Sequence, residues 1–187
     1  MPIDVLFVNP SNAVGAYQGL ANDYSAIEPP TWALLLAESM RSVGYDVGIM
    51  DINAERLSVE SAVRNIERSK VRLICLVVYG QNPNSGTINM AGAAALASAL
   101  KENKVKAPIC AVGSHMSALP IEVLQTESAI DFVLCNEGVY ALKNVLAVDL
   151  ENLENLRNVK GIAYRELSKA LINDPEVTVP QRRMDID

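Results

Sequence analysis

The residues best suited to bind a large polar ligand lie in four short segments, each of which follows an apolar stretch of the chain. The two longest segments, 9–28 and 79–87, carry amides, hydroxyls and glycines rather than charges, which indicates hydrogen bonding to a bulky polar ligand. No catalytic residue and no metal ligand is predicted among them. The candidate binding residues are Asn9, Pro10, Tyr79, Gly80, Asn82, Ser85, Thr87, Gly113, Ser114, His115, Glu137 and Gly138.

His115 and Glu137 are the titratable side chains of most interest in this set. A lone histidine is more often a surface or packing residue than a ligand, but the position of His115 in the Val-Gly-Ser-His run 112–115 favours a place facing the ligand. Glu137 has an ordinary interpretation too, because a carboxylate in the first turn of a helix is stabilised by the helix dipole. Glu137 can also contact the ligand, because this role is compatible with a place in the first turn of a helix.

Several familiar sites are excluded by motifs that the chain lacks. Gly15 and Gly19 come too late for a dinucleotide-binding G-x-G-x-x-G turn, and no G-x-x-x-x-G-K-S/T phosphate loop occurs. A single histidine and the lack of G-x-S-x-G argue against a hydrolytic triad. A flavodoxin-type site stays open, with Ser11 and Asn12 as partners for a flavin phosphate.

The cysteines are predicted to be buried apolar residues. Cys75, Cys110 and Cys135 lie in separate apolar runs, too far apart for a zinc knuckle, a C-x-x-C pair or an iron–sulfur triplet. Three unpaired thiols suit a reducing compartment, so a cytoplasmic location is expected. A net charge of −6 argues against nucleic acid or an anionic membrane as partner, and no apolar run is long enough to span a membrane.

Short apolar runs alternate with longer amphipathic ones along the chain, which predicts strands alternating with helices. Between the strands, Pro29-Pro30 precedes a helix with Trp32, Leu35, Leu36, Met40 and Val43 on its buried face. Ser58 is expected to cap the next helix, an alanine-rich helix covers 91–97, another begins near Pro120, and the last covers 137–146. The predicted strands are 3–8, 46–50, 71–78, 109–112 and 131–134.

This alternation predicts an α/β fold: a three-layer, doubly wound, parallel five-stranded sheet, Rossmann-like or flavodoxin-like, with strand order 2-1-3-4-5. Such sheets bind ligands where the order reverses, here between the first and third strands, and the long irregular segments 9–28 and 79–87 follow those two strands. Residues 1–150 are expected to form this domain, 151–173 an appended β-hairpin, and 174–187 an extended linker.

The order of these motifs resembles the N-terminal cobalamin-binding domain of cobalamin-dependent radical S-adenosylmethionine enzymes. The resemblance covers about residues 3 to 175. The motifs that carry it are Val8-Asn9-Pro10, Pro29-Pro30, Gly44-Tyr45-Asp46-Val47 with Asp51, the run 79–87, Val112-Gly113-Ser114-His115, the run 131–139 and Gly161-Ile162-Ala163-Tyr164-Arg165. The chain departs from the family pattern at Val112, Ser114 and Asn136.

The resemblance implies that the candidate residues bind cobalamin, with the benzimidazole tail buried and no histidine on the lower face of cobalt. The D-x-H-x-x-G motif that supplies such a histidine elsewhere is absent. The resemblance also implies a C-terminal catalytic domain of the parent chain, which would hold the 4Fe–4S cluster and S-adenosylmethionine. The cluster cannot lie in the present chain, because its three cysteines cannot form C-x-x-x-C-x-x-C. Two alternatives stay open: an α/β interaction domain that has lost its cofactor, and a flavin-binding module.

Overall fold

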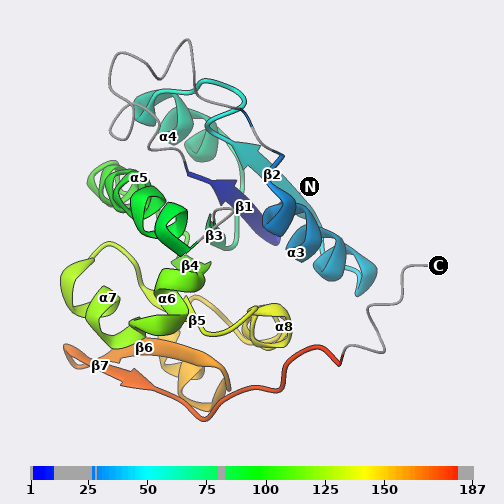
Figure 1. Cartoon of the computed structure of the whole chain (residues 1–187), viewed down its shortest axis with the longest axis vertical. Coiled ribbons are helices and arrows are strands. Elements are labelled where there is room, and N and C mark those ends of the chain that lie inside the picture. The colour runs from blue at the N-terminus through cyan, green and yellow to red at the C-terminus, as the bar shows by residue number, and fades with distance from the viewer. Residues whose placement is uncertain (1, 11–26, 28, 80–82, 181–187) are drawn as a thin grey trace.

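The computed structural model describes residues 2–10, 27, 29–79 and 83–180, and for 83–88 only the course of the helix. Its core is one sheet with helices on both faces (Figure 1). The strands are β1 (Val5–Asn9), β2 (Val47–Asp51), β3 (Ile74–Val78), β4 (Ile109–Gly113), β5 (Phe132–Leu134), β6 (Ile162–Glu166) and β7 (Lys169–Ile172). The helices are α3 (Thr31–Ser42), α4 (Val59–Arg68), α5 (Pro83–Glu102), α6 (Ser114–Ala118), α7 (Pro120–Thr126), α8 (Val139–Leu146) and the 3-10 helix η2 (Leu153–Asn158).

The sheet has the order β2-β1-β3-β4-β5-β6-β7, so its five parallel strands follow the predicted order 2-1-3-4-5. The predicted hairpin forms β6 and β7, but it is part of the same sheet. Phe132 and Leu134 of β5 pair antiparallel with Tyr164 and Ile162 of β6. The sheet therefore has seven strands rather than five, because the apolar half of β6 extends the core beyond β5.

Two apolar layers fill the space between the sheet and its helices. On one face α4, α5, α6 and α7 cover side chains such as Val8 and Leu76. On the other face α3, α8 and η2 cover Phe7, Cys75 and Phe132. Strands 1, 3 and 4 are buried on both sides, as expected for the centre of a parallel sheet. None of the helices in the described ranges is both long and apolar enough to cross a membrane.

Local capping explains where α4 begins. The Ser58 hydroxyl accepts a hydrogen bond from the backbone N–H of Ser61 at 3.2 Å, which confirms the predicted N-cap. Its buried face is Ala62, Val63 and Ile66, the face that the periodicity predicts.

The buried face of α3 differs from the prediction. Alanines alternate with larger residues on the side toward the sheet. The buried residues are Ala33, Leu36, Ala37 and Met40. Leu36 and Met40 were placed correctly, whereas Trp32, Leu35 and Val43 were not, since they are exposed by 43%, 56% and 46%.

Two further boundaries also differ from the prediction. The helix α5 begins at Pro83, so Ser85 and Thr87 lie in its first turns rather than in a loop that runs to 87. Proline is favoured in the first turn of a helix because its missing N–H needs no partner there. The last helix begins at Val139 rather than at 137, because Gly138 adopts a left-handed conformation (φ 73°) as its N-cap.

Candidate functional site

Strand pairing diverges where the strand order reverses. Val8 is the last residue of β1 that pairs with β3. One residue further, Asn9 pairs with Asp51 of β2, whereas Val78 at the end of β3 pairs with Gly113 of β4. The carboxyl ends of β1 and β3 therefore turn to opposite neighbours, and this edge of the sheet is where a doubly wound fold binds its ligand.

The end of β1 is tied to the end of β2 by polar side chains. The Asn9 amide Nδ2 donates to Asp51 Oδ1 at 3.1 Å, and the following Pro10 is buried. Asp51 Oδ1 also accepts from the backbone N–H groups of Asn53 and Ala54, both at 3.1 Å. Asp51 is only 8% exposed, and no hydrogen-bond donor among the described residues reaches its Oδ2.

The end of β3 carries an aromatic side chain that spans the edge of the sheet. The ring of Tyr79 stacks on Trp32 of α3, with ring centroids 4.5 Å apart and an interplanar angle of 21°. Its hydroxyl donates to the carbonyl of Asn136, after β5, at 3.2 Å, and its carbonyl accepts from Asn89 Nδ2. Burial, together with the negative charge of Glu137, raises the pKa of Tyr79, so the phenol is neutral and donates at physiological pH.

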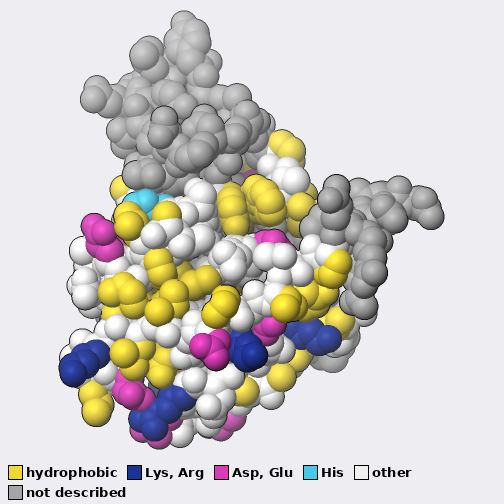
Figure 2. Space-filling model, turned by 60° about the horizontal axis from the view of Figure 1, so that its bottom comes forward, with side chains coloured by type: hydrophobic (Ala, Val, Ile, Leu, Met, Phe, Trp, Pro, Cys, Tyr) yellow, Lys and Arg dark blue, Asp and Glu magenta, His cyan; other side chains and the backbone are white. Residues whose placement is uncertain are grey.

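The end of β4 lies against the end of β3 without space for a side chain. A Cβ on Gly113 would lie 2.1 Å from the carbonyl oxygen of Val78, and Gly113 has φ 158°. Only glycine permits this approach. Ser114 then begins α6, and His115, in the first turn, is partly exposed (Figure 2, cyan).

The turn after β5 gathers hydrogen bonds from the same edge. Asn136, in a left-handed conformation (φ 55°), is exposed, and its carbonyl accepts from both Tyr79 and the Ser117 hydroxyl at 3.2 Å. Glu137 precedes α8 and does not lie in its first turn, which corrects the helix-dipole interpretation. Its carboxylate accepts from the backbone N–H of Val179.

The structure thus brings one group of predicted residues to a single edge of the sheet. These are Asn9, Pro10, Tyr79, Gly113, Ser114, His115, Glu137 and Gly138. Gly80 and Asn82 lie outside the described residues, as do Ser11 and Asn12. Ser85 and Thr87 follow in the first turns of α5, where only the backbone is described.

Sequence reasoning missed Trp32, Ser117 and Asn136 as residues of this edge. Trp32 is the clearest case. Two apolar stripes run along α3, and the stripe with Trp32, Leu35 and Val43 has the larger side chains, which favours it as the buried face when only the sequence is considered. The spacing of Ala33, Leu36, Ala37 and Met40 at i, i+3, i+4 and i+7 is the signal that would have identified the buried stripe.

The cysteines behave as core residues. Cys75 and Cys110 are fully buried. Burial is the main reason why the pKa of Cys110 lies well above its usual value, and the neighbouring Cys75 raises this pKa further. Burial also raises the pKa of Cys135, so this half-buried thiol stays protonated. Among the described residues, no three His, Cys, Asp or Glu side chains come together as a metal site.

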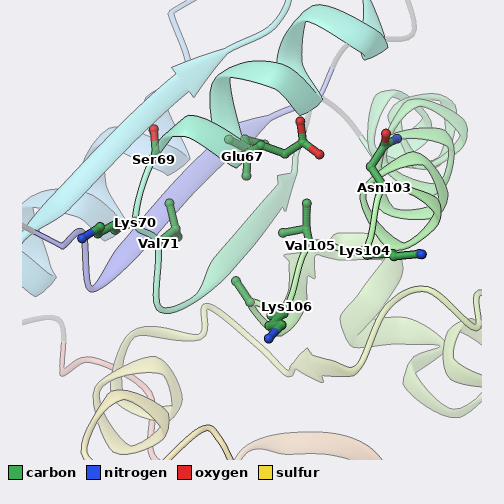
Figure 3. Close-up of a pocket in the computed structure, with 10 residues that line it drawn as sticks. Glu67, Ser69, Lys70, Val71, Asn103, Lys104, Val105 and Lys106 are labelled. Atoms are coloured by element: carbon green, nitrogen blue, oxygen red, sulfur yellow. The ribbon is translucent and has the colours of Figure 1, made fainter.

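A cavity of about 320 Å³ lies at the opposite edge of the sheet, where α4 and α5 end and β3 and β4 begin (Figure 3). Lys70, Lys104 and Lys106 line it, but Figure 3 shows their side chains pointing in different directions. All three lysines are exposed. The cavity is a solvated groove without convergent groups, and we do not place the ligand there.

Comparison with solved structures supports this assignment of the fold. TsrM from Kitasatospora setae, a radical S-adenosylmethionine methyltransferase solved with cobalamin and a 4Fe–4S cluster bound, is 18% identical with a TM-score of 0.68. The match covers 97% of this chain and 30% of that one. OxsB, a cobalamin-dependent radical enzyme solved with aqua-cobalamin bound, is 18% identical with a TM-score of 0.63, over 95% of this chain and 23% of that one.

This chain therefore spans less than a third of the length of either structure. No curated protein sequence matches it. The sequence profile of the family described as the B12 binding domain matches residues 17–146, which is more than half of the chain. This match includes β2 to β5, and with them the β3 side of the place where the strand order reverses. The chain therefore belongs to the B12 binding domain family.

Proposed function

We propose that this chain binds cobalamin at the carboxyl edge of its sheet, as the cofactor-binding module of a larger cobalamin-dependent radical S-adenosylmethionine enzyme. The divergence of the β1 and β3 ladders carries the proposal, because it is located where a member of this family needs an opening. The structures of TsrM and OxsB, solved with cobalamin bound, support it.

The residues at this edge fit the cofactor in chemical type. Corrin carries many carboxamide groups, and the edge offers amides, hydroxyls, backbone carbonyls and one buried carboxylate oxygen without a donor. Asn9, Pro10, Tyr79, Gly113, Ser114, His115, Glu137 and Gly138 would hold the cofactor, with Gly80, Asn82, Ser85 and Thr87 from the adjoining segment. Cobalamin supplies a redox-active cobalt that can carry a methyl group.

We further propose that cobalamin binds with its benzimidazole detached from cobalt and without a histidine ligand. The chain has one histidine, His115, at the start of α6, and it lacks the D-x-H-x-x-G motif. Electron paramagnetic resonance of the bound Co(II) form tests this. We expect no nitrogen splitting from an axial ligand, and the same spectrum from a His115→Ala variant. A nitrogen splitting that disappears in this variant would contradict the proposal.

The catalytic step belongs to another part of the parent enzyme in this proposal. The cysteines described here lie in or directly after buried strands and cannot hold a 4Fe–4S cluster. The chain would bind and orient the cofactor and shield it from solvent, and a domain with the cluster and S-adenosylmethionine would act on the substrate.

The binding test uses the purified chain and hydroxocobalamin under reducing conditions, followed by gel filtration. We expect corrin absorbance to elute with the protein, and to be reduced at least about tenfold in a Tyr79→Ala variant, which removes an aromatic wall of the site. A Lys104→Ala variant at the opposite edge is the matched control and should bind like the wild type.

Folded wild-type protein that elutes without corrin would overturn the proposal. That result would favour the interpretation as an interaction domain that has lost its cofactor. A yellow chromophore on the purified protein would instead favour a flavin.

A further inference from the structure

Asp51 is the one charged residue that is fully buried in the described part of the chain, and half of its carboxylate has no partner. Its Oδ1 accepts three hydrogen bonds, from Asn9 Nδ2 and from the backbone of the turn at 53 and 54. Its Oδ2 accepts none from the residues that the structure describes, although Asp51 is only 8% exposed. None of the four ion pairs of the described residues includes it.

A buried carboxylate oxygen without a hydrogen-bond donor is unfavourable in a protein with no ligand bound. Nearly all buried polar atoms in folded proteins have a hydrogen-bond partner, and an ionised acceptor is the most costly to leave without one. The turn itself needs only Oδ1. The second oxygen lies at the carboxyl end of β2 beside the tip of β1, where a donor from a bound molecule would satisfy it.

The chemistry of that donor follows from the neighbour of Asp51. The Nδ2 of Asn9 donates to Asp51, and the other polar atom of the same side-chain amide, Oδ1, is an acceptor. This carbonyl oxygen and the second carboxylate oxygen of Asp51 are two acceptors on neighbouring side chains, which suits the two N–H groups of a primary carboxamide. A metal ion is a poor alternative, because no cluster of three ligating side chains occurs in the described ranges.

We infer that Asn9 and Asp51 together bind the NH₂ group of one peripheral carboxamide of cobalamin. This inference rests on the proposed function and adds a residue, Asp51, and a contact that sets the orientation of the corrin. It makes the site selective for the neutral amide, because a carboxylate in its place would be repelled by Asp51.

Asp51→Asn is the sharpest variant, because it keeps Oδ1 for the turn and replaces only the free oxygen with an NH₂ group. Spectrophotometric titration with hydroxocobalamin should show about a 10- to 100-fold weaker affinity, the range for a lost hydrogen bond to a charged group. Asp46→Asn is the matched control, since Asp46 is exposed just before β2 at the opposite edge of the sheet. It should bind like the wild type.

The same contact can be tested by changing the ligand instead of the protein. Each cobalamin monocarboxylate has one peripheral amide converted to an acid. One of these should bind the wild type at least about tenfold more weakly than cobalamin does, and Asp51→Asn should restore its affinity. The monocarboxylate series needs no variant, so it also decides the question if Asp51→Asn fails to fold.

The two proposals fail separately. If wild-type protein does not bind cobalamin, the proposed function is wrong and this inference falls with it. If wild-type protein binds cobalamin, but Asp51→Asn binds it equally well or all monocarboxylates bind like cobalamin, only the carboxamide contact is wrong.

Discussion

Trp32 stacks on Tyr79 across the carboxyl edge of the sheet, with their ring centroids 4.5 Å apart. Trp32 comes from the first turn of α3 and Tyr79 directly follows β3, so the contact joins a helix of one layer to the tip of a central strand. The hydroxyl of Tyr79 extends this connection to Asn136 after β5. The pair lies at the carboxyl edge of the sheet on the side covered by α3.

The fluorescence of Trp32 should therefore report ligand binding. It is the only tryptophan of the chain, and cobalamin absorbs where tryptophan emits, so a corrin at this edge should quench most of the emission. The measurement is a titration with hydroxocobalamin, corrected with free tryptophan at the same concentrations. Emission that stays constant while corrin co-elutes with the protein would place the ligand elsewhere.

Gly113→Ala should destabilise the fold by about 3 kcal/mol, because the new methyl group would lie 2.1 Å from the carbonyl oxygen of Val78. Gly44→Ala is the matched control. Gly44 also has a positive φ, of 95°, but no atom lies within 4 Å of its Cβ position, so only backbone strain of about 1 kcal/mol is expected. Urea unfolding measures both. Equal losses in the two variants would show that the close approach costs little.

The two-residue turn between β6 and β7 should be improvable. Leu167 and Ser168 both have positive φ, 45° and 70°, which defines a turn that favours Asn-Gly. The double substitution Leu167→Asn, Ser168→Gly should raise the free energy of unfolding by about 1 kcal/mol. Ser168→Ala serves as control and should give no gain. A double variant with an unchanged or lower melting temperature would contradict this account of the turn.

Tyr79→Phe should change how stability depends on alkaline pH. Folding raises the pKa of Tyr79, so the unfolded chain loses the phenol proton at a lower pH than the folded protein does. The contribution of the neutral phenol to the free energy of unfolding is therefore complete below about pH 10 and is lost as pH rises through the folded pKa. At neutral pH the variant should lose about 1 kcal/mol with the hydrogen bond to Asn136. Above about pH 10 the difference from wild type should shrink. Parallel stability curves would contradict this prediction.

The strand order could be predicted from the sequence, and so could the edge of the sheet at which the candidate residues lie. Both depend on patterns of single segments and on general rules of chain connection. The unbroken apolar run around Cys75 identified a central strand, and Ser58 marked a helix start. Glu137 follows β5 as predicted, whereas Gly113 is the last residue of β4 rather than the residue after it.

The details that were missed depend on contacts between distant segments. Trp32 and Tyr79 are 47 positions apart, and no local pattern shows that one stacks on the other. The start of α5 was missed because Asn82-Pro83-Asn84 is typical of a loop as well as of a helix N-terminus. The free oxygen of Asp51 became visible only when burial and hydrogen bonds could be assigned atom by atom.

The contact between Gly113 and Val78 has a mechanical consequence for the site. It clasps β3 to β4, and the Tyr79–Asn136 hydrogen bond adds the turn after β5 to the same unit. On the other side, Asn9 is fastened to Asp51 but is no longer paired with β3. If cobalamin binds at this edge, we expect the ends of β3, β4 and β5 to keep their positions and the ends of β1 and β2 to move to admit it.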